Sequence, residues 1–165
     1  MRSHPLRALP LALIPIVAAV AMACGGGKTE PPVAGTTATA AAGSDLTPFQ
    51  LENGIGPVTE VVQVGPIDKH MAEEGEKLFT AKCSACHKMT DRYVGPPLGA
   101  VTVRRAPAFI MNQILNPDGM YTKHPVVKQL LGEYMTQMPN LGLTRDQARQ
   151  VLEYLRTQAP GKAAS

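Results

Sequence analysis

The stretch Cys83-Ser84-Ala85-Cys86-His87 decides how the rest of the chain is interpreted. Two thiols lie three positions apart, and an imidazole follows the second thiol directly. With this spacing, one turn of chain lets both thiols reach the two vinyl groups of one porphyrin and places the imidazole under the iron. This pattern is the attachment signature of c-type haem. We therefore expect one covalent haem c on Cys83 and Cys86, with His87 as an iron ligand.

Three other interpretations of the motif make demands that the chain does not meet. A thioredoxin-like redox pair requires a βαβ setting, whereas the flanking sequence is helical in pattern. A zinc site requires a fourth ligand, and neither His70 nor His124 belongs to a second ligand pair. A disulfide between Cys83 and Cys86 would be strained. Haem remains the preferred interpretation.

The N-terminal residues predict export. Arg2 and Arg7 precede an apolar run, Leu9–Val20, which is shorter than the about 20 residues that a membrane-spanning helix needs. The run ends in Ala21-Met22-Ala23-Cys24, which resembles the lipobox of bacterial lipoproteins and implies cleavage before Cys24 and acylation of its thiol. The alternative is an ordinary Ala-x-Ala secretory site with an incidental cysteine. We expect an extracytoplasmic, membrane-anchored lipoprotein with a signal peptide at 1–23.

The chain after the signal divides by composition. Residues 24–48 contain a triple glycine, Pro31-Pro32 and a Thr/Ala-rich run, so this segment cannot bury enough apolar surface to offset its ordering entropy. We expect a disordered linker there. Residues 49–66 are apolar but contain helix breakers, which predicts an extended arm packed on the domain, with a short strand at Val61–Val64. The working domain is expected at 67–160 and a disordered tail at 161–165.

Helical patterns fill the domain, and we expect an all-α fold of about four helices wrapped around one haem. Asp68 is a suitable N-cap for a first helix that ends at Lys82, and Gly75 within it predicts close approach of another helix. Thr144 and Gln147 form a capping-box pattern before the last helix. Two further helices are expected to begin at prolines, one over Pro107–Leu115 and one from Pro125 to before Met138.

The order of these elements resembles class I cytochrome c. The matching features are Gly75 and Phe79 in the first helix, the haem motif, Gly95-Pro96-Pro97-Leu98, Met138-Pro139, and a last helix with Tyr154 and Leu155. The resemblance implies that the Pro96 carbonyl accepts a hydrogen bond from His87 Nδ1 and that the first and last helices cross at a glycine–aromatic contact. The chain departs from the family in lacking tryptophan, which often holds a haem propionate. Candidates for that role are Arg104, Arg105, Tyr93 and Tyr121.

Met138 is the expected sixth ligand of the iron, and position separates it from the other methionines. Met138 lies in a loop, precedes Pro139 and comes six residues before Thr144, so the loop can carry its sulfur across the haem face opposite His87. The other methionines have other settings: Met1 and Met22 belong to the signal, Met71 and Met111 to helices, and Met89 lies close to His87. Met120 is expected in a more distant loop, and Met135 is assigned to the core at a helix end.

These features predict an electron carrier and not an enzyme. Iron with two protein ligands has no open position for a substrate, and His/Met ligation raises the potential. The resemblance implies a monomer that serves redox protein partners in a respiratory chain, with a terminal reductase or oxidase as a candidate acceptor. The net charge of +3 is too weak for nucleic-acid binding. The alternative, a haem peroxidase or a gas or redox sensor, needs a displaceable sixth ligand; its spare histidines, His70 and His124, are expected on the surface.

Overall fold

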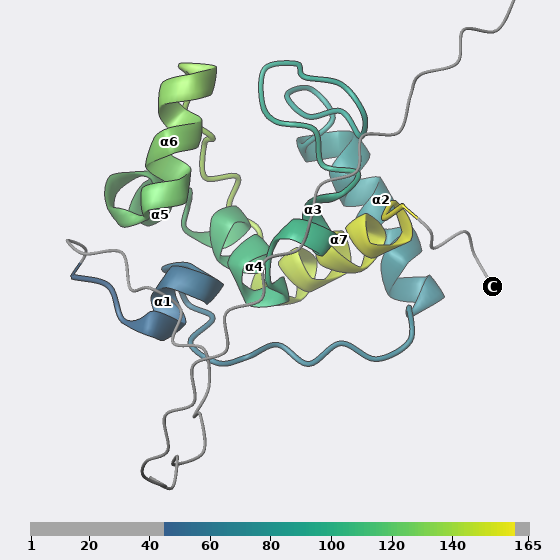
Figure 1. Ribbon diagram of the computed structural model, residues 1–165. Helices are drawn as coiled ribbons and strands as arrows, with labels where there is room; N and C mark the ends of the chain where they lie inside the picture. Colours follow the sequence, from purple (N-terminus) through teal and green to yellow (C-terminus); the bar gives the residue numbers. More distant parts are fainter. Residues whose placement is uncertain (1–44, 161–165) are drawn as a thin grey trace, which may run out of the picture. The chain divides into compact units, whose positions relative to one another are not determined.

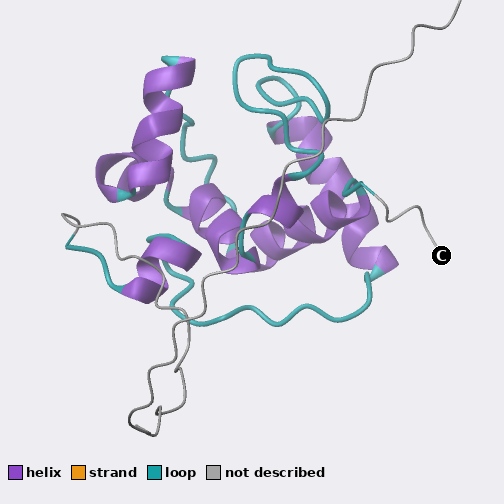
Figure 2. Ribbon diagram, viewed as in Figure 1, coloured by secondary structure: helices purple, strands orange, loops and turns teal. Residues whose placement is uncertain are grey.

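The computed structural model describes residues 45–160. Over this range the chain forms seven helices and no strand, which confirms the all-α class (Figures 1 and 2). The predicted signal peptide, the Cys24 acylation site, most of the linker and the C-terminal tail lie outside the described residues. The helices are α1 (Pro48–Asn53), α2 (Lys69–Lys82), α3 (Val101–Arg104), α4 (Pro107–Leu115), α5 (Pro117–Lys123), α6 (Pro125–Tyr134) and α7 (Arg145–Thr157).

The four longer helices match the predicted ones, and their start signals act as expected. The Asp68 side chain accepts a hydrogen bond from the Met71 amide at the start of α2. Thr144 and Gln147 form a reciprocal capping box at the start of α7. α4 and α6 each begin with a proline. Because these signals act within one turn, sequence alone locates them. The short helices α1, α3 and α5 were not predicted.

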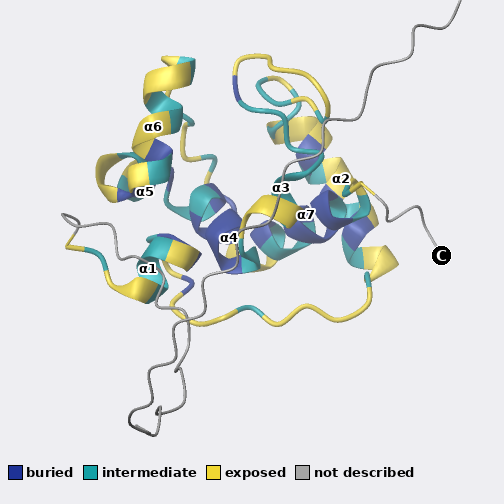
Figure 3. Ribbon diagram, viewed as in Figure 1, coloured by how far each residue is buried: buried dark blue, intermediate teal, exposed yellow. Residues whose placement is uncertain are grey.

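α2 and α7 pack closely at Gly75, as the sequence predicts. A Cβ atom on Gly75 would lie 2.0 Å from the carbonyl oxygen of Gln150 and 3.0 Å from Tyr154 Cβ. One turn further along α2, the rings of Phe79 and Tyr154 are 5.3 Å apart between centroids. Buried residues lie along α4, α7 and the facing side of α2 (Figure 3). This helix crossing fixes the end of α2, from which the haem motif continues.

The prediction of an extended arm over 49–66 with a strand at Val61–Val64 is wrong in two respects. Residues 48–53 form α1, which starts with a Thr47–Gln50 capping box and ends at Gly54, whose φ is 78°. The segment 61–64 forms no strand, and Val61 is 59% exposed. The apolar spacing of 61–64 suggested a strand, but the described residues contain no strand with which this segment could pair.

The backbone of this N-terminal segment is hydrogen-bonded by polar side chains of the helices and not by a neighbouring strand. Asn112 on α4 is fully buried; its Nδ2 donates to the carbonyls of Asn53 and Val58, and its Oδ1 accepts from the Val58 amide, at 2.9–3.0 Å. Arg156 on α7 donates to the Gly65 carbonyl at 2.6 Å. The backbone of the segment therefore bonds to side chains far away in sequence, an arrangement that local pattern analysis does not detect.

His124 is buried, which contradicts the expectation that it lies on the surface. It is 1% exposed, its Nε2 is 3.1 Å from the Leu51 carbonyl oxygen, and its ring meets Phe109 edge-on. Burial lowers the pKa of His124, although the Leu51 carbonyl opposes that shift. α1 covers this side chain. Because the sequence did not predict α1, it did not predict the burial of His124. His70 on α2 is exposed, as expected.

No helix within residues 45–160 has both the length and the apolar character that crossing a membrane requires.

Candidate functional site

The Cys83–His87 motif forms a tight turn directly after α2. Cys83 caps the helix, and its backbone N–H donates a hydrogen bond to the Phe79 carbonyl. The backbone N–H groups of Cys86 and His87 then donate to the Cys83 carbonyl at 3.0 and 2.9 Å. Both cysteines are partly buried free thiols. Burial raises the pKa of the Cys83 thiol. The turn presents both thiols and the imidazole together at one end of α2.

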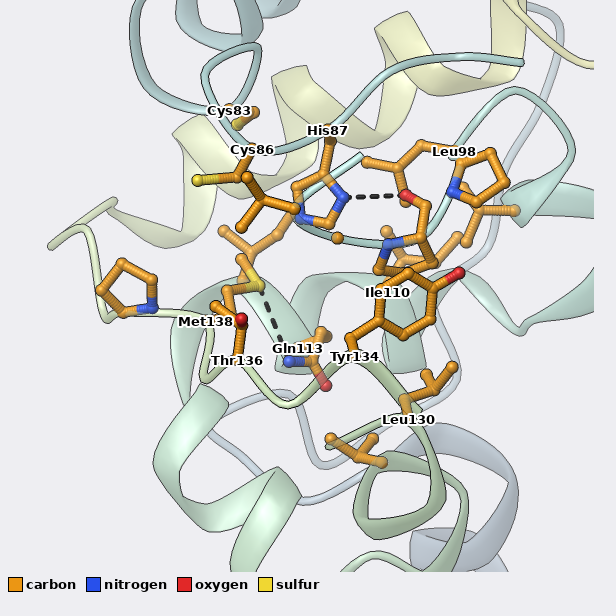
Figure 4. Close-up of a pocket in the computed structure, with 18 of the residues that line it drawn as sticks. Cys83, Cys86, His87, Leu98, Ile110, Gln113, Leu130, Tyr134, Thr136 and Met138 are labelled. Carbon is orange, nitrogen blue, oxygen red and sulfur yellow. Dashed lines mark hydrogen bonds between the residues drawn. The ribbon is translucent and has the colours of Figure 1, made fainter. Parts of the chain in front are cut away.

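An apolar cavity of about 460 Å³ lies beside this turn (Figure 4). Its walls come from α4, α6, α7, the 94–98 segment and the loop that follows α6. Ile110 and Leu130 are typical of its lining. Its volume lies within the range of pockets that enclose small-molecule ligands and cofactors. Cys83, Cys86 and His87 all line this cavity.

The Gly95–Pro96 segment holds the His87 ring in a defined orientation. His87 Nδ1 lies 2.9 Å from the Pro96 carbonyl oxygen. A carbonyl only accepts, so Nδ1 must carry the hydrogen and Nε2 is left as the basic nitrogen. A Cβ on Gly95 would lie 2.4 Å from His87 Cε1, so the backbone approaches the ring at a distance that glycine alone permits. This contact matches the one implied by the family resemblance.

Met138 reaches the same cavity from the loop between α6 and α7, far along the chain from His87. It is the only methionine of residues 45–160 that lines the cavity. Gln113 Nε2 on α4 donates to Met138 Sδ at 3.7 Å (Figure 4). The structure therefore brings together all the expected side-chain ligands, which are Cys83, Cys86, His87 and Met138.

Two other methionines differ from their expected settings. Met135, assigned to the core, is 83% exposed, and it caps α6 in the left-handed conformation, with φ of 53°. Met120, expected in a loop, is fully buried in α5, and its sulfur accepts from the Ile55 amide at 3.0 Å. Neither sulfur lines the cavity.

Of the four candidate propionate-binding residues, three line the cavity and one does not. Arg104, Arg105 and Tyr121 line the cavity, whereas Tyr93 does not. Tyr93 is 56% exposed, and the centroid of its ring lies 4.9 Å from the Lys88 ammonium.

Gln113 also lines the cavity. Sequence reasoning did not single out Gln113, because a polar residue on a short helix usually faces solvent.

The residues around the cavity fit a haem. Two adjacent thiols, an imidazole with a free basic nitrogen and a thioether are the donors that c-type haem uses, and the apolar walls suit a porphyrin. The backbone at Gly95 leaves room for the His87 ring and little else. The donor set and the cavity therefore agree.

Comparisons with known proteins place the chain in one family. The family model for cytochrome c matches residues 72–159. The structure of cytochrome c from Rhodothermus marinus is 49% identical, with a TM-score of 0.64, and the match covers 68% of this chain and 97% of that one. An engineered form of that cytochrome, bound to a carbene intermediate, is 48% identical over 68% of this chain and 98% of its own, with a TM-score of 0.62.

A shorter match involves a cytochrome c-553-like protein of Synechocystis sp. It is 37% identical over 46 residues, which are 27% of this chain and 44% of the relative, so this chain matches less than half of that protein. The family model covers more than half of the chain, and the Rhodothermus structure is matched almost throughout its length. The chain therefore belongs to the cytochrome c family.

Proposed function

We propose that this haem-binding electron carrier moves single electrons through one covalent haem c, bonded to Cys83 and Cys86 and ligated by His87 and Met138. The observation that carries the proposal is the meeting of His87 and Met138 at one apolar cavity, although they come from separate loops. When bound, haem supplies a one-electron couple between ferric and ferrous iron.

Each surrounding side chain has a defined part in this function. The Pro96 carbonyl keeps the proton on His87 Nδ1, so that Nε2 stays basic and the ring keeps its orientation. Apolar walls exclude water, which disfavours the more highly charged ferric state. Arg104 and Arg105, which are exposed yet line the cavity, provide cations for the propionates.

The structure gives no support to the peroxidase or sensor alternative. A peroxidase needs an acid–base group beside the iron, and neither spare histidine of the described residues lines the cavity. His124 is enclosed under α1, and His70 is exposed on α2. A thioether at the sixth position leaves outer-sphere electron transfer as the remaining reaction.

We further propose that the protein is an exported lipoprotein. Cleavage before Cys24 and acylation of its thiol would anchor the domain through residues 24–48. The domain would then meet redox protein partners of a respiratory chain as a monomer on the extracytoplasmic side. The support for this proposal is the sequence of residues 1–48.

Extraction with acidified acetone tests the attachment of haem, because a thioether survives conditions that remove non-covalent haem. Mass spectrometry of the exported protein should show one added haem after extraction, and the Cys83→Ala/Cys86→Ala double variant should show none.

Carbon monoxide binding tests the sixth ligand. Carbon monoxide should bind slowly or not at all to the reduced wild-type protein at neutral pH. Complete release of haem to acetone, or fast carbon monoxide binding, would contradict the proposal.

A further inference from the structure

Arg92 links the loop that follows the haem motif to the end of α6. Its Nη1 donates to Glu133 Oε1 at 2.9 Å, and its Nη2 donates to the Glu133 backbone carbonyl at 2.7 Å. The guanidinium carbon lies 4.2 Å from the centroid of the Tyr134 ring. Within residues 45–160, no other hydrogen bond joins this loop to α6. One side chain therefore makes three contacts with the last two residues of the helix.

The two linked parts carry the two expected iron ligands. The loop of Arg92 is fastened to the haem motif, because the Gly95 N–H donates to the Cys86 carbonyl at 2.8 Å. Tyr134 lines the cavity, and three residues separate it from Met138 (Figure 4). Since four residues of extended chain span at most about 14 Å, the position of the α6 end limits where the Met138 sulfur can move.

α6 has few other attachments near this end. Among the helices of the described residues it packs only on α5, which precedes it. Its one buried residue, Val127, lies in its first turn. Leu130 and Leu131 line the cavity, so bound haem would add to the attachment of the helix. The protein contacts that hold the C-terminal end of α6 are therefore those of Arg92.

We infer that Arg92 is a positioning residue for the Met138 loop: it fastens the end of α6 to the loop beside His87 and so restricts dissociation of Met138 from the iron. The inference rests on the proposed function, in which Met138 is the sixth ligand. The Glu133 carbonyl is one of the last four of α6, which have no partner within the helix. Arginine suits this place because its planar fork reaches two oxygens and an aromatic face together, which lysine cannot do.

The magnitude follows from the strength of these contacts. An added ligand reaches the sixth position only in molecules from which Met138 has dissociated, so its apparent affinity is the intrinsic affinity multiplied by the open fraction. An exposed ion pair changes an equilibrium by up to about fivefold, and an exposed cation–π contact by about twofold to fivefold. The Arg92 and Glu133 side chains are 56% and 48% exposed, so solvent screens the pair. We expect the open fraction to rise about threefold to tenfold without Arg92.

The test is imidazole binding to the ferric holoprotein, followed by loss of the weak far-red charge-transfer band of methionine-ligated haem. At about pH 8 imidazole is uncharged, so the loss of a cation from the protein does not itself alter its attraction. Arg92→Gln removes the charge and the fork, and Glu133→Gln removes the carboxylate but keeps the carbonyl. The matched control is Arg145→Gln, since Arg145 is an exposed arginine of α7 that pairs with Glu60 and does not line the cavity.

Arg92→Gln should bind imidazole about threefold to tenfold more tightly than wild type, Glu133→Gln should show a smaller increase, and Arg145→Gln should match wild type. Because Arg92 and Glu133 act through each other, the double variant should bind no more tightly than Arg92→Gln. A purely structural role would lower thermal stability and leave the affinity of the native protein unchanged.

Wild-type affinity in both Arg92→Gln and Glu133→Gln, or an equal increase in Arg145→Gln, would overturn the inference. The far-red band of the wild-type protein separates this outcome from failure of the proposed function. If the band is present, only the role of Arg92 is refuted. If it is absent, the assignment of Met138 fails first and the inference falls with it.

Discussion

Two helical glycines allow the packing of α2 on α7 to be tested with a matched pair of substitutions. Gly75 lies where a Cβ would be 2.0 Å from the Gln150 carbonyl oxygen, and Gly132 on α6 has no atom within 4 Å of the same position. Alanine gains about 1 kcal/mol over glycine in a helix interior. We therefore expect Gly75→Ala and Gly132→Ala to change stability in opposite directions.

The magnitude at Gly75 follows from the overlap. Real Cβ atoms stay at least 3.0 Å from other atoms, so α2 and α7 must separate by about 1 Å. The obstacle is helix backbone and cannot rotate away, so the cost lies near the upper end of about 1–3 kcal/mol for overpacking. After the helix-propensity gain, Gly75→Ala should lose about 2 kcal/mol, or about 8 °C in Tm, whereas Gly132→Ala should gain up to about 1 kcal/mol, or about 4 °C.

Thermal unfolding of the holoproteins, followed by far-ultraviolet circular dichroism at one protein concentration and pH, measures both changes. Comparing the two variants removes the intrinsic preference for alanine that they share. Equal Tm shifts, or a Gly75→Ala protein as stable as the wild type, would show that the close contact between α2 and α7 is wrong.

Three further predictions concern the N-terminal segment and the side chains that contact it. Asn112→Ala removes three buried hydrogen bonds to the 53–58 backbone and should lower the free energy of unfolding by about 2–4 kcal/mol in a denaturant titration, whereas Asn140→Ala, at an exposed loop position, should have little effect. The folded-state pKa of His124 lies below its unfolded value of about 6.5, so its contribution to stability is present above that pH and is lost as the pH falls; wild type should therefore lose more stability between pH 7.5 and 5.5 than His124→Gln. Cys24→Ser should leave the protein exported but move it from the membrane to the soluble fraction, and a variant that still pellets with membranes would refute the anchor.

The parts of the fold that follow from sequence are those set by interactions within one turn. Asp68 and Thr144 accept hydrogen bonds from amides three residues away, and the two helix-starting prolines have a fixed φ and no N–H that needs a partner, so their helices were located correctly. Gly75 was informative because a glycine within a helix requires a close packing partner. The adjacent ligands of the Cys83–His87 motif were found for the same local reason.

The parts that sequence reasoning missed depend on contacts between distant residues. α1 is tied to α4 by Asn112, and its Leu51 carbonyl receives His124, so neither the helix nor the buried histidine has a local signal. Thr47 and Gln50 did form a recognisable capping box, which could have located α1 despite the glycines that follow. Gln113 gave no signal of its own, since its partner Met138 lies 25 positions away.

The central claim, that Met138 and His87 ligate one haem from opposite sides, is tested most directly by the far-red absorption of the oxidised protein. Methionine sulfur bound to ferric haem gives a weak charge-transfer band in this region, and wild type should show it. Met138→Ala should abolish the band, lower the potential and open the iron to carbon monoxide. Met135→Ala, which removes the side chain of a residue that is 83% exposed and three positions away, should leave all three properties unchanged. A band that persists in Met138→Ala, or that disappears in Met135→Ala, would contradict the account.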